Sequence, residues 1–527
     1  MANNVSTIHP LLRSRMNQIR RSRDAYSGTD SIKRLDNDLL GSQAFIRIDE
    51  EYLPRLSGQD QDMYDSYKTR AVFFAAMSRT VVALVGAIDR KPPTIKGAEA
   101  IESFSADVTG QGVSLNEFLA EIEAEVMISG RVTVCIDRKN GGDNKPYLIW
   151  YKSEDTINWF SKTYSDYDEK LCKMVFRESY FGVNPENEYE QVKMEQYREY
   201  KLDEVTGEAS VTLWRCEDQD ERSSEKEFTA FEQYTLTNRG RPLGFLPCVP
   251  IVSDGSILEV PKPPLLDLVD VNIAHYRNSA DYEHGMHWTA LPTPYFTGLS
   301  DRDGEITIGS GNAIILPDPS SSAGFLEFTG TGLSTIKTAM DHKESMMSAL
   351  GARMLAGKMD QSTSAEVARI NYSGETAALS NIAKSMSRGV TKLLKMVALW
   401  ENQAGSEAIQ VHLNEDYVDS KLAAADITAL MGAYQGGVMS LESLVWNLDQ
   451  GERLPTGRTI DEEMALIESD LDREAEEALF YEGENIAFSG KHFSSDAGSA
   501  LAAEDSHTMP DGTVMKGKKH KEDKEDK

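Results

Sequence analysis

Three long helical patterns, interrupted by one small strand-rich module, constrain this fold more than any other feature of the sequence. In chain order they are a helix at about 265–287, short strands over 293–328, a helix at about 333–354, a polar loop, and a helix at about 373–402. Prolines stand before the first helix and directly after it, where the ring and the missing N–H stop a helix. This order predicts one structural unit in which a small β module joins two long helices.

The third of these helices carries a regular apolar stripe. Its apolar residues recur at steps of three and four, which is a heptad-like spacing. They are Leu379, Ile382, Met386, Val390, Leu393, Val397 and Trp400. A single stripe of this kind favours packing within a domain over a coiled coil.

The sequence pattern predicts helices over residues 61–130. Its most apolar stretch, 71–88, has Arg79 at its centre, and a charge there costs about 2.5–3.5 kcal/mol in a membrane. We therefore predict a buried helix and no membrane span. Ser114 and Glu117 form a capping-box pattern at the start of a second helix, expected over 115–129.

Residues 131–255 are rich in strand signals separated by turns, which predicts an antiparallel meander and an α+β chain. The expected strands are Val132 to Ile136, Tyr147 to Tyr151, Lys173 to Tyr180, Gln196 to Tyr200 and Val211 to Trp214. Acidic inserts such as 217–221 are expected to be exposed loops.

Both ends of the chain have biased compositions. Residues 1–60 are expected to be peripheral, with a basic cluster on a helix. Its members are Arg13, Arg15, Arg20, Arg21 and Arg23. A solvated helix face is the simpler interpretation, and contact with DNA or a protein is the alternative. Residues 421–483 are expected to be helical, 461–484 is strongly acidic, and the polar end from about 494 is expected to be disordered.

The net charge excludes one class of nucleic-acid-binding protein. Lys and Arg number 55 and Asp and Glu number 85, which gives −30. Such a charge excludes a protein that grips nucleic acid over a broad basic surface, but not one that handles DNA without holding it. The four cysteines, Cys135, Cys172, Cys216 and Cys248, are far apart in sequence. They are expected to be reduced and mostly buried, as in an intracellular, soluble protein.

The motifs that could indicate nucleotide binding or metal binding are incomplete in this sequence. Gly330-Thr331-Gly332 lacks the third glycine of a dinucleotide loop, and the glycines at 351 and 357 are too far apart for a P-loop. Glu283, His284 and His287 lie together, but the spacing of a metal-binding helix is absent, so a polar helix end is the preferred interpretation. No catalytic, cofactor or metal residues are predicted, and no enzyme activity is expected.

Three stretches resemble the portal proteins of tailed bacteriophages, in particular a portal-like family catalogued as a domain of unknown function. They are Tyr52-Leu53-Pro54 with the following YDSYKTRAVFFAAMSRTVVALVGAIDRKPP, the stretch PPLLDLVDVNIAHYRNSADYEHGMHWTALPTPYFTG from Pro263 to Gly298, and Gly351 to Trp400. A weaker match is AYQGGVMSLESLVWNL. Together the resemblance spans roughly residues 50–470.

The resemblance implies a ring-forming portal fold with a helix-rich wing and crown, two stem helices, a small β-containing clip, a tunnel loop and a long helix. The implied parts are 1–50 N-terminal arm, 51–260 wing, 261–290 stem helix, 291–330 clip, 331–356 second stem helix, 357–372 tunnel loop, 373–420 long helix and wing return, 421–490 crown helices and 491–527 disordered tail.

By the same resemblance, about twelve copies surround a channel for double-stranded DNA at one capsid vertex of the virion, assembled in the bacterial cytoplasm. The implied partners are the terminase large subunit, the major capsid protein, and head-completion, adaptor and tail proteins. DNA-facing candidates in the tunnel loop are Arg353, Lys358, Gln361, Ser362 and Thr363. Candidates for channel-facing or intersubunit positions in the stem are Asp267, Asp270, Arg277 and Asp281.

Two other classes stay open from the residues alone. One is a carboxylate-dependent intracellular hydrolase, because carboxylates are plentiful. The other is an acidic scaffold protein without a channel.

Overall fold

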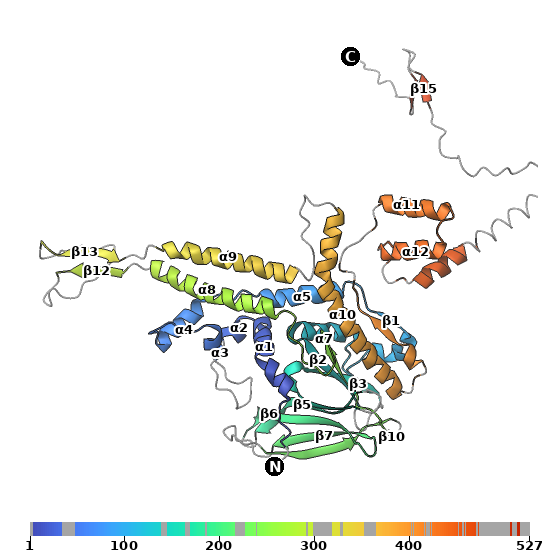
Figure 1. The fold of residues 1–527 in the computed structure, drawn as a ribbon, viewed down its shortest axis with the longest axis horizontal. Coiled ribbons are helices and arrows are strands. Elements are labelled where there is room, and N and C mark those ends of the chain that lie inside the picture. Colours follow the sequence, from blue (N-terminus) through green and yellow to red (C-terminus); the bar gives the residue numbers. More distant parts are fainter. Residues whose placement is uncertain are drawn as a thin grey trace, which may run out of the picture. The chain divides into compact units, whose positions relative to one another are not determined.

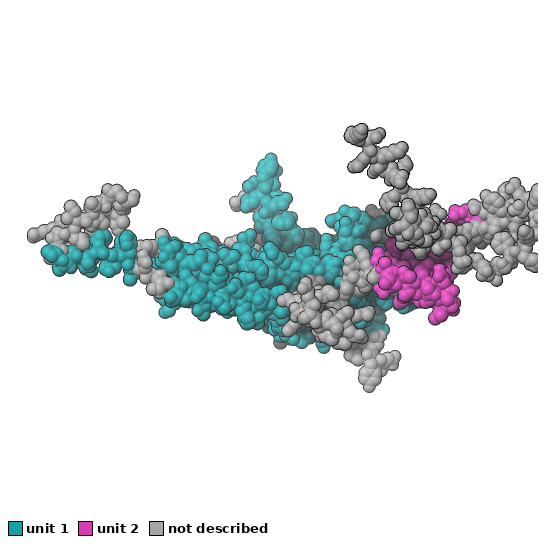
Figure 2. All heavy atoms as spheres, turned by 90° about the horizontal axis from the view of Figure 1, so that it is seen from above, with its two compact units in different colours: residues 1–418 teal, residues 419–527 magenta. Residues whose placement is uncertain are grey.

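The structure, a computed structural model, consists of two compact units, residues 1–418 and 419–527 (Figure 2). It describes residues 4–33, 48–138, 145–163, 169–184, 187–216, 227–238, 240–290, 293–298, 319–326, 330–352, 365–401, 403, 405–415, 417, 422, 424–451, 453–455, 458, 460–470, 473, 506–508 and 514–516.

In the first unit, helices dominate both ends of the sequence and strands dominate its middle (Figure 1). Its helices are α1 (Pro10–Ser27), α2 (Thr29–Lys33), α3 (Ile48–Tyr52), α4 (Gln61–Arg70), α5 (Ala76–Ile88), α6 (Glu102–Ser105), α7 (Leu115–Ser129), α8 (Leu266–Ala290), α9 (Thr331–Ala352) and α10 (Ala365–Glu401). Short 3-10 turns are η1 (Ala98–Ile101), η2 (Ser153–Asp155) and η3 (Ser406–Ala408). Its strands are β1 (Thr94–Lys96), β2 (Arg131–Arg138), β3 (Pro146–Lys152), β4 (Thr156–Thr163), β5 (Glu169–Asn184), β6 (Asn187–Leu202), β7 (Ala209–Cys216), β8 (Phe228–Thr235), β9 (Thr237–Asn238), β10 (Arg241–Pro242), β11 (Cys248–Val252), β12 (Thr293–Thr297), β13 (Ser322–Leu326) and β14 (Gln410–His412).

The strands of the middle region form antiparallel sheets. β4 to β8 make a five-stranded meander in chain order, and β11, β2 and β3 make a three-stranded sheet in that order. The predicted antiparallel meander is confirmed, and every strand expected between residues 131 and 216 lies within an observed one. β11 joins the first sheet from far along the chain, a pairing that local periodicity does not predict.

Two cysteines that are distant in sequence meet in that first sheet. Cys135 on β2 stands opposite Cys248 on β11, with the Sγ atoms 2.9 Å apart, and both thiols are free and buried. The neighbouring Ile136 N–H donates to the Pro247 carbonyl at 2.8 Å, so the cysteines occupy a non-hydrogen-bonded pair, where side chains approach most closely. Cys172 and Cys216 are half-buried, and neither is in a disulfide among the described residues.

α7 has the capping box that its sequence predicts. The Ser114 hydroxyl accepts from the Glu117 N–H, and the Glu117 carboxylate accepts from the Ser114 N–H. The helix ends at Gly130, whose φ of 82° lies in the left-handed region. A Cβ at Gly130 would lie 3.2 Å from the Lys262 carbonyl oxygen, so a side chain is excluded there by both conformation and space.

The described N-terminal residues 4–33 contribute to the core, so the expectation that residues 1–60 are peripheral is wrong for this part. α1 packs against α5, α7 and α8. Its residues Leu12, Ile19 and Ala25 are fully buried. The first two are seven residues apart and therefore lie on one helical face, a signal that the basic cluster beside it obscured.

The apolar segment at residues 71–88 forms a shorter and more exposed helix than predicted. α5 starts at Ala76, and only one of its faces reaches the core, through Met77, Val81 and Leu84. Val82 is 67% exposed on another face. Among the described helices, none is both long and apolar enough for a membrane span.

α10 is the long helix that the apolar stripe predicts, and every residue of that stripe is buried. The helix lies against β11 and β14. It begins at Ala365, so residues 365–372 are helical and were wrongly predicted as loop. Ala365, Glu366 and Ala368 are strong helix formers, which accounts for the earlier start.

The second unit contains α11 (Ala424–Gln435), α12 (Leu441–Gln450), a further helical segment at residues 460–470, and the short strands β15 (Ser506–Thr508) and β16 (Val514–Lys516). The predicted helical character of residues 421–483 is confirmed where the structure describes it. β15 and β16 pair antiparallel, so the prediction of a wholly disordered tail is wrong for these six residues. Asp511-Gly512 between them is a strong turn signal.

Two ionisable side chains in the core of the first unit, Glu123 and Arg131, lack a hydrogen-bond partner among the described residues. Both Glu123 carboxyl oxygens on α7 are buried. Burial, together with the charge of Asp89, raises the Glu123 pKa to about 9, so this side chain is neutral at pH 7. Arg131 is fully buried, its guanidinium carbon stands 4.1 Å from the Trp159 ring, and burial lowers its pKa to about 9.

Replacing Glu123 with Gln should flatten the pH dependence of folding stability. The pKa of Glu123 is about 9 in the folded state, above its ordinary value of 4.5. The stability contributed by the protonated side chain is therefore fully present below about pH 4.5, and it is lost as the pH rises toward 9. Between pH 5 and pH 8, the unfolding free energy of the wild-type chain should fall by about 2–4 kcal/mol more than that of Glu123→Gln, as measured by urea unfolding. The exposed Glu188→Gln is the control, and equal slopes for all three proteins would contradict the assignment.

Replacing Gly389 with Val should destabilise the contact between α10 and β11. A Cβ at Gly389 would lie 2.9 Å from Ile251 Cγ1, which forces the strand and helix apart. We expect a loss of about 1–3 kcal/mol in unfolding free energy, the usual cost of overpacking. Gly86→Val on α5, where a Cβ meets nothing within 4 Å, is the matched control. Equal unfolding free energies for the two variants would show that the contact between α10 and β11 does not require glycine at residue 389.

Candidate functional site

The most distinctive part of the first unit is an arm formed by α8, β12, β13 and α9 (Figure 1). α8 and α9 run side by side and antiparallel, and β12 pairs only with β13 among the described strands. His275 Nε2 lies 3.2 Å from the Glu344 carboxylate, and the Lys343 ammonium donates to Asn278 at 3.2 Å. The structure thus has the helix, β module and helix that the sequence predicts.

Local sequence explains both ends of this arm. Prolines at 261, 263 and 264 precede α8, and Gly330, with φ of 63°, precedes α9. The Gly-Thr-Gly motif at 330–332 is therefore a turn into a helix. Near the tip, a Cβ at Gly285 would lie 2.6 Å from Leu333 Cδ2, so the glycine allows the two helices to approach closely.

The four predicted stem residues all lie on α8, and three of them contact the N-terminal part of the same chain. Asp270 lies 3.4 Å from the Arg21 guanidinium. Arg277 donates to the carbonyl oxygens of Tyr52 and Glu51 at 2.8 and 3.0 Å. Asp281 accepts from the Tyr67 hydroxyl at 2.6 Å. The fourth, Asp267, pairs with Lys262 at 2.5 Å. Asp270, Arg277 and Asp281 thus hold the arm to the N-terminal part of the body. The channel or intersubunit role of all four residues stays a prediction.

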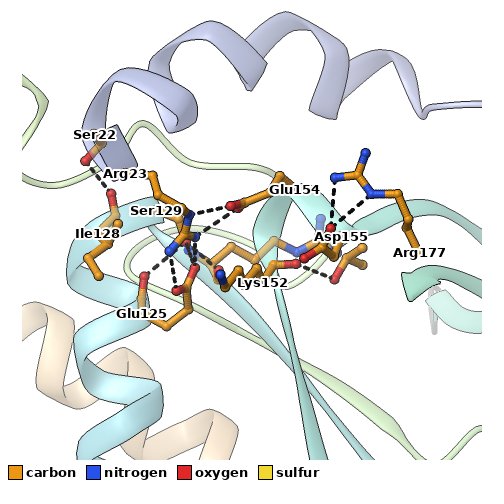
Figure 3. A network of polar contacts seen from close by, with 11 residues as sticks. Ser22, Arg23, Glu125, Ile128, Ser129, Lys152, Glu154, Asp155 and Arg177 are labelled. Atoms are coloured by element: carbon orange, nitrogen blue, oxygen red, sulfur yellow. Dashed lines mark hydrogen bonds and ion pairs between the residues drawn. The ribbon is translucent and has the colours of Figure 1, made fainter. Parts of the chain in front are cut away.

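Arg23 of the N-terminal basic cluster is bound inside the chain (Figure 3). It pairs with Glu125 on α7 at 2.5 Å and with Glu154 on η2. Burial opposes its charge, but these two carboxylates raise the Arg23 pKa above its ordinary value. Arg20 likewise pairs with Glu51. The interpretation as a solvated face is therefore wrong for Arg23 and Arg20, because their partners are distant in sequence.

The same network continues across the body (Figure 3). The Ser22 hydroxyl donates to the Ile128 carbonyl at 2.6 Å and joins α1 to α7. Arg177 on β5 donates to Asp155 on η2 at 2.8 Å. The body that carries the arm is therefore tied together by polar contacts as well as by its apolar core.

A cavity of about 440 Å³ lies between α4 and the outer half of α8, and the sequence alone did not indicate it. Its lining combines one cation, one carboxylate, two imidazoles, an indole, and neutral polar and apolar side chains. The lining residues are Leu56, Ser57, Gly58, Gln59, Asp62, Met63, Ser66, Arg70, His284, His287 and Trp288. We call this cavity the α4–α8 socket.

Two hydrogen bonds join the nitrogen-bearing side chains of the socket. A guanidinium only donates, so Arg70 Nη2, 3.2 Å from His287 Nε2, donates to an unprotonated ring nitrogen. The Trp288 indole donates to His284 Nε2 at 3.0 Å. Burial and the nearby Arg70 charge lower the His284 pKa, which keeps this ring neutral. The socket lining therefore contains one cation, Arg70, and one carboxylate, Asp62. Among the described residues, Arg70 forms no ion pair with a carboxylate within 4 Å.

The two histidines line the socket together with Arg70 and Trp288. Within the described ranges, no three His, Cys, Asp or Glu residues are grouped so that they could hold a metal ion. The tunnel-loop candidates Arg353, Lys358, Gln361, Ser362 and Thr363 lie outside the described residues, in the interval between α9 and α10. The strands expected at 305–308 and 313–316 and the loop at 217–221 also lie outside them.

Comparison with solved structures finds similarity to chains of gene transfer agent (GTA) particles. A chain from the neck of an empty GTA particle, computed with C6 symmetry, is 12% identical with a TM-score of 0.37, over 77% of this chain and 97% of that chain. A chain from the virion of a native GTA particle is 12% identical with a TM-score of 0.36, over the same shares. A chain from the neck of a native GTA particle, computed with C12 symmetry, is 10% identical with a TM-score of 0.35, over 75% of this chain and 95% of that chain.

Comparison by sequence finds one family and no curated protein. No curated protein matches this chain. Residues 264–401 match the family described as a domain of unknown function (DUF4055). The matched segment starts two residues before α8 and ends with the last residue of α10, so it contains the whole arm and the long helix behind it.

Proposed function

We propose that this chain is a portal protein, which forms a ring of about twelve copies around a channel for double-stranded DNA at one vertex of a phage-type capsid. In this proposal the arm is the stem and clip, the interval between α9 and α10 is the tunnel loop, and α10 is the helix behind it. The proposed role is structural and not enzymatic.

The observation that carries the proposal is the order and geometry of the elements from α8 to α10. Two antiparallel helices of 25 and 22 residues are joined through a small hairpin and followed by a 37-residue helix. The sequence pattern predicts this order, and the resemblance implies the same order of stem, clip, stem, tunnel loop and long helix in portal proteins. α9 supports a ring further, because only Met347 among its described side chains is buried, so most of its surface is available to other copies.

The charge of the chain suits a conduit. Each phosphate neutralised by Lys or Arg increases DNA affinity, and many such contacts would hold the duplex in place. Twelve copies at −30 each carry about −360 formal charges, screened beyond about 8–10 Å at ordinary salt. Acidic walls repel the duplex and keep it centred, while sparse cations such as Lys358 touch phosphates briefly.

The proposed partners follow from this role. The terminase large subunit docks on the clip during packaging, and head-completion, adaptor and tail proteins replace it afterwards. The major capsid protein surrounds the ring in the virion, after assembly in the bacterial cytoplasm.

The purified full chain should form closed rings with a central channel. Electron microscopy and native mass spectrometry measure ring closure and copy number. A stable monomer at micromolar concentration, in solution and in particles, would contradict the portal proposal. Rings that also turn over a substrate would favour the hydrolase alternative. Assembly that survives deletion of residues 291–328 and shows no channel would favour the scaffold.

Changes in the tunnel loop should affect DNA more than assembly. Lys358→Ala, or deletion of residues 358–363, removes the proposed transient phosphate contacts. We expect normal ring yield with a decrease of about tenfold or more in DNA-filled particles, because each lost contact weakens DNA retention. Lys193→Ala on β6 is the control for loss of one lysine. Normal yields of filled particles would show that this segment is not the DNA-contacting loop.

A further inference from the structure

Cys135 and Cys248 stand directly opposite each other in the three-stranded sheet formed by β11, β2 and β3. The flanking hydrogen bond from Ile136 N–H to the Pro247 carbonyl makes them a non-hydrogen-bonded pair, in which the two Cα atoms are about 4.5 Å apart. Disulfides usually join residues whose Cα atoms are about 4.4–6.8 Å apart. The backbone of this pair therefore already has the spacing that a disulfide needs.

The two thiols also lie on the same face of the sheet and point toward each other. Their Sγ atoms are 2.9 Å apart. A disulfide bond of about 2.0 Å requires these atoms to approach by about 0.9 Å. Cysteines whose Cα atoms are this close and whose side chains converge can be joined without backbone movement. The two strands therefore need neither to separate nor to slide.

We infer that Cys135 and Cys248 are a site of reversible oxidation, at which a low-molecular-weight disulfide such as oxidised glutathione converts the two thiols into a disulfide between β2 and β11. One cysteine thiolate attacks a sulfur of the small disulfide, which forms a mixed disulfide and releases one small thiolate. The second cysteine thiolate attacks the protein sulfur of the mixed disulfide and releases the other small thiolate. The released thiolates take up the two protons that the cysteines lost. Two electrons from the protein thiols thus reduce one small disulfide to two small thiols.

The other two cysteines are too far apart to be joined in this fold. Cys172 stands one residue before the row of the meander that contains Lys201 of β6. Cys216 stands one residue after the row that contains Gln196 of the same strand. These two rows lie five residues apart along β6, which is about 17 Å at 3.4 Å per residue. Cys172 and Cys216 are therefore matched controls within the same chain.

Burial determines when the reaction can occur. Cys135 is fully buried and Cys248 is 2% exposed. Burial, followed by the neighbouring Cys248 thiol, raises the Cys135 pKa well above its ordinary value, which keeps the reactive thiolate scarce. We therefore expect oxidation before β11 pairs with β2, or when β11 opens transiently. The same burial shields the finished disulfide from reductants.

The disulfide would fasten the central sheet to the strand that precedes the arm. β11 ends at Val252, α8 begins at Leu266, and β11 also packs against α10. The bond would close a loop of 113 residues that contains β3 to β10, and cross-links that close long loops remove the most chain entropy from the unfolded state. In the proposed portal role, the released particle carries the chain from a reducing cytoplasm to an oxidising exterior, where the bond would form. Only this last consequence rests on the proposed function.

Mass spectrometry of the full chain tests the bond. The chain is synthesised in a cell-free system that contains oxidised glutathione, so that the thiols meet the oxidant before they are buried. It is then blocked with N-ethylmaleimide and digested with trypsin without reduction. We expect peptides 132–138 and 240–277 to be linked, about tenfold more often than any other pair, and to separate after treatment with dithiothreitol. Absence of this link, or an equal yield of a link between Cys172 and Cys216, would overturn the inference.

Melting of the oxidised and reduced chains tests what the bond does. The oxidised wild type should have a Tm about 5 °C above that of the reduced wild type, because a loop of 113 residues is closed. Cys135→Ala should lose both this difference and the linked peptides, whereas the double variant C172A/C216A should keep both. A redox-dependent Tm that persists in Cys135→Ala would contradict the assignment. The link in the wild type needs no variant that might fail to fold. Absence of rings would overturn the portal proposal and leave this result standing, since both cysteines belong to one chain.

Discussion

The packing of the first half of α8 is the constraint on which the rest of the first unit depends. Leu268, Val269, Ile273 and Tyr276 are buried there, where α1, α4 and α5 cover one side of the helix and α9 covers another. Polar contacts strengthen the same region, since Asn272 donates to the Phe74 carbonyl at 2.8 Å and Val72 N–H donates to the Ser279 hydroxyl at 2.9 Å. A helix held this firmly at one end can extend beyond the body and carry a hairpin at its tip.

This anchoring changes how the acidic residues of α8 are understood. Asp270 and Asp281 are partners of α1 and α4 in the same chain, which makes them part of the attachment. An internal contact does not decide whether these carboxylates also face the proposed channel, because the Asp270 side chain is still 49% exposed. The socket brings a cation, a carboxylate and aromatic rings together, through Arg70, Asp62 and Trp288.

Local patterns predicted the regular elements well. The stripe from Leu379 to Trp400, the capping box at Ser114 and the strands of the meander each depend on residues close in sequence, and each was found where expected. Prediction failed where distant residues decide the environment. Arg23 reads as a surface cation until Glu125 and Glu154 surround it, and the Cys135–Cys248 contact requires the pairing of β2 with β11.

The sequence by itself determined the α+β class, the order of helix, β module, helix and long helix, and the acidic net charge, because periodicity, proline placement and composition are local properties. The tertiary structure alone decided which charges are paired and which are unmatched. Arg70 is 214 residues away from His284, and the two meet only because α4 packs against α8. Burial and pairing depend on such long-range contacts. The α4–α8 socket, with Arg70 in its lining, is therefore evident only from the tertiary structure.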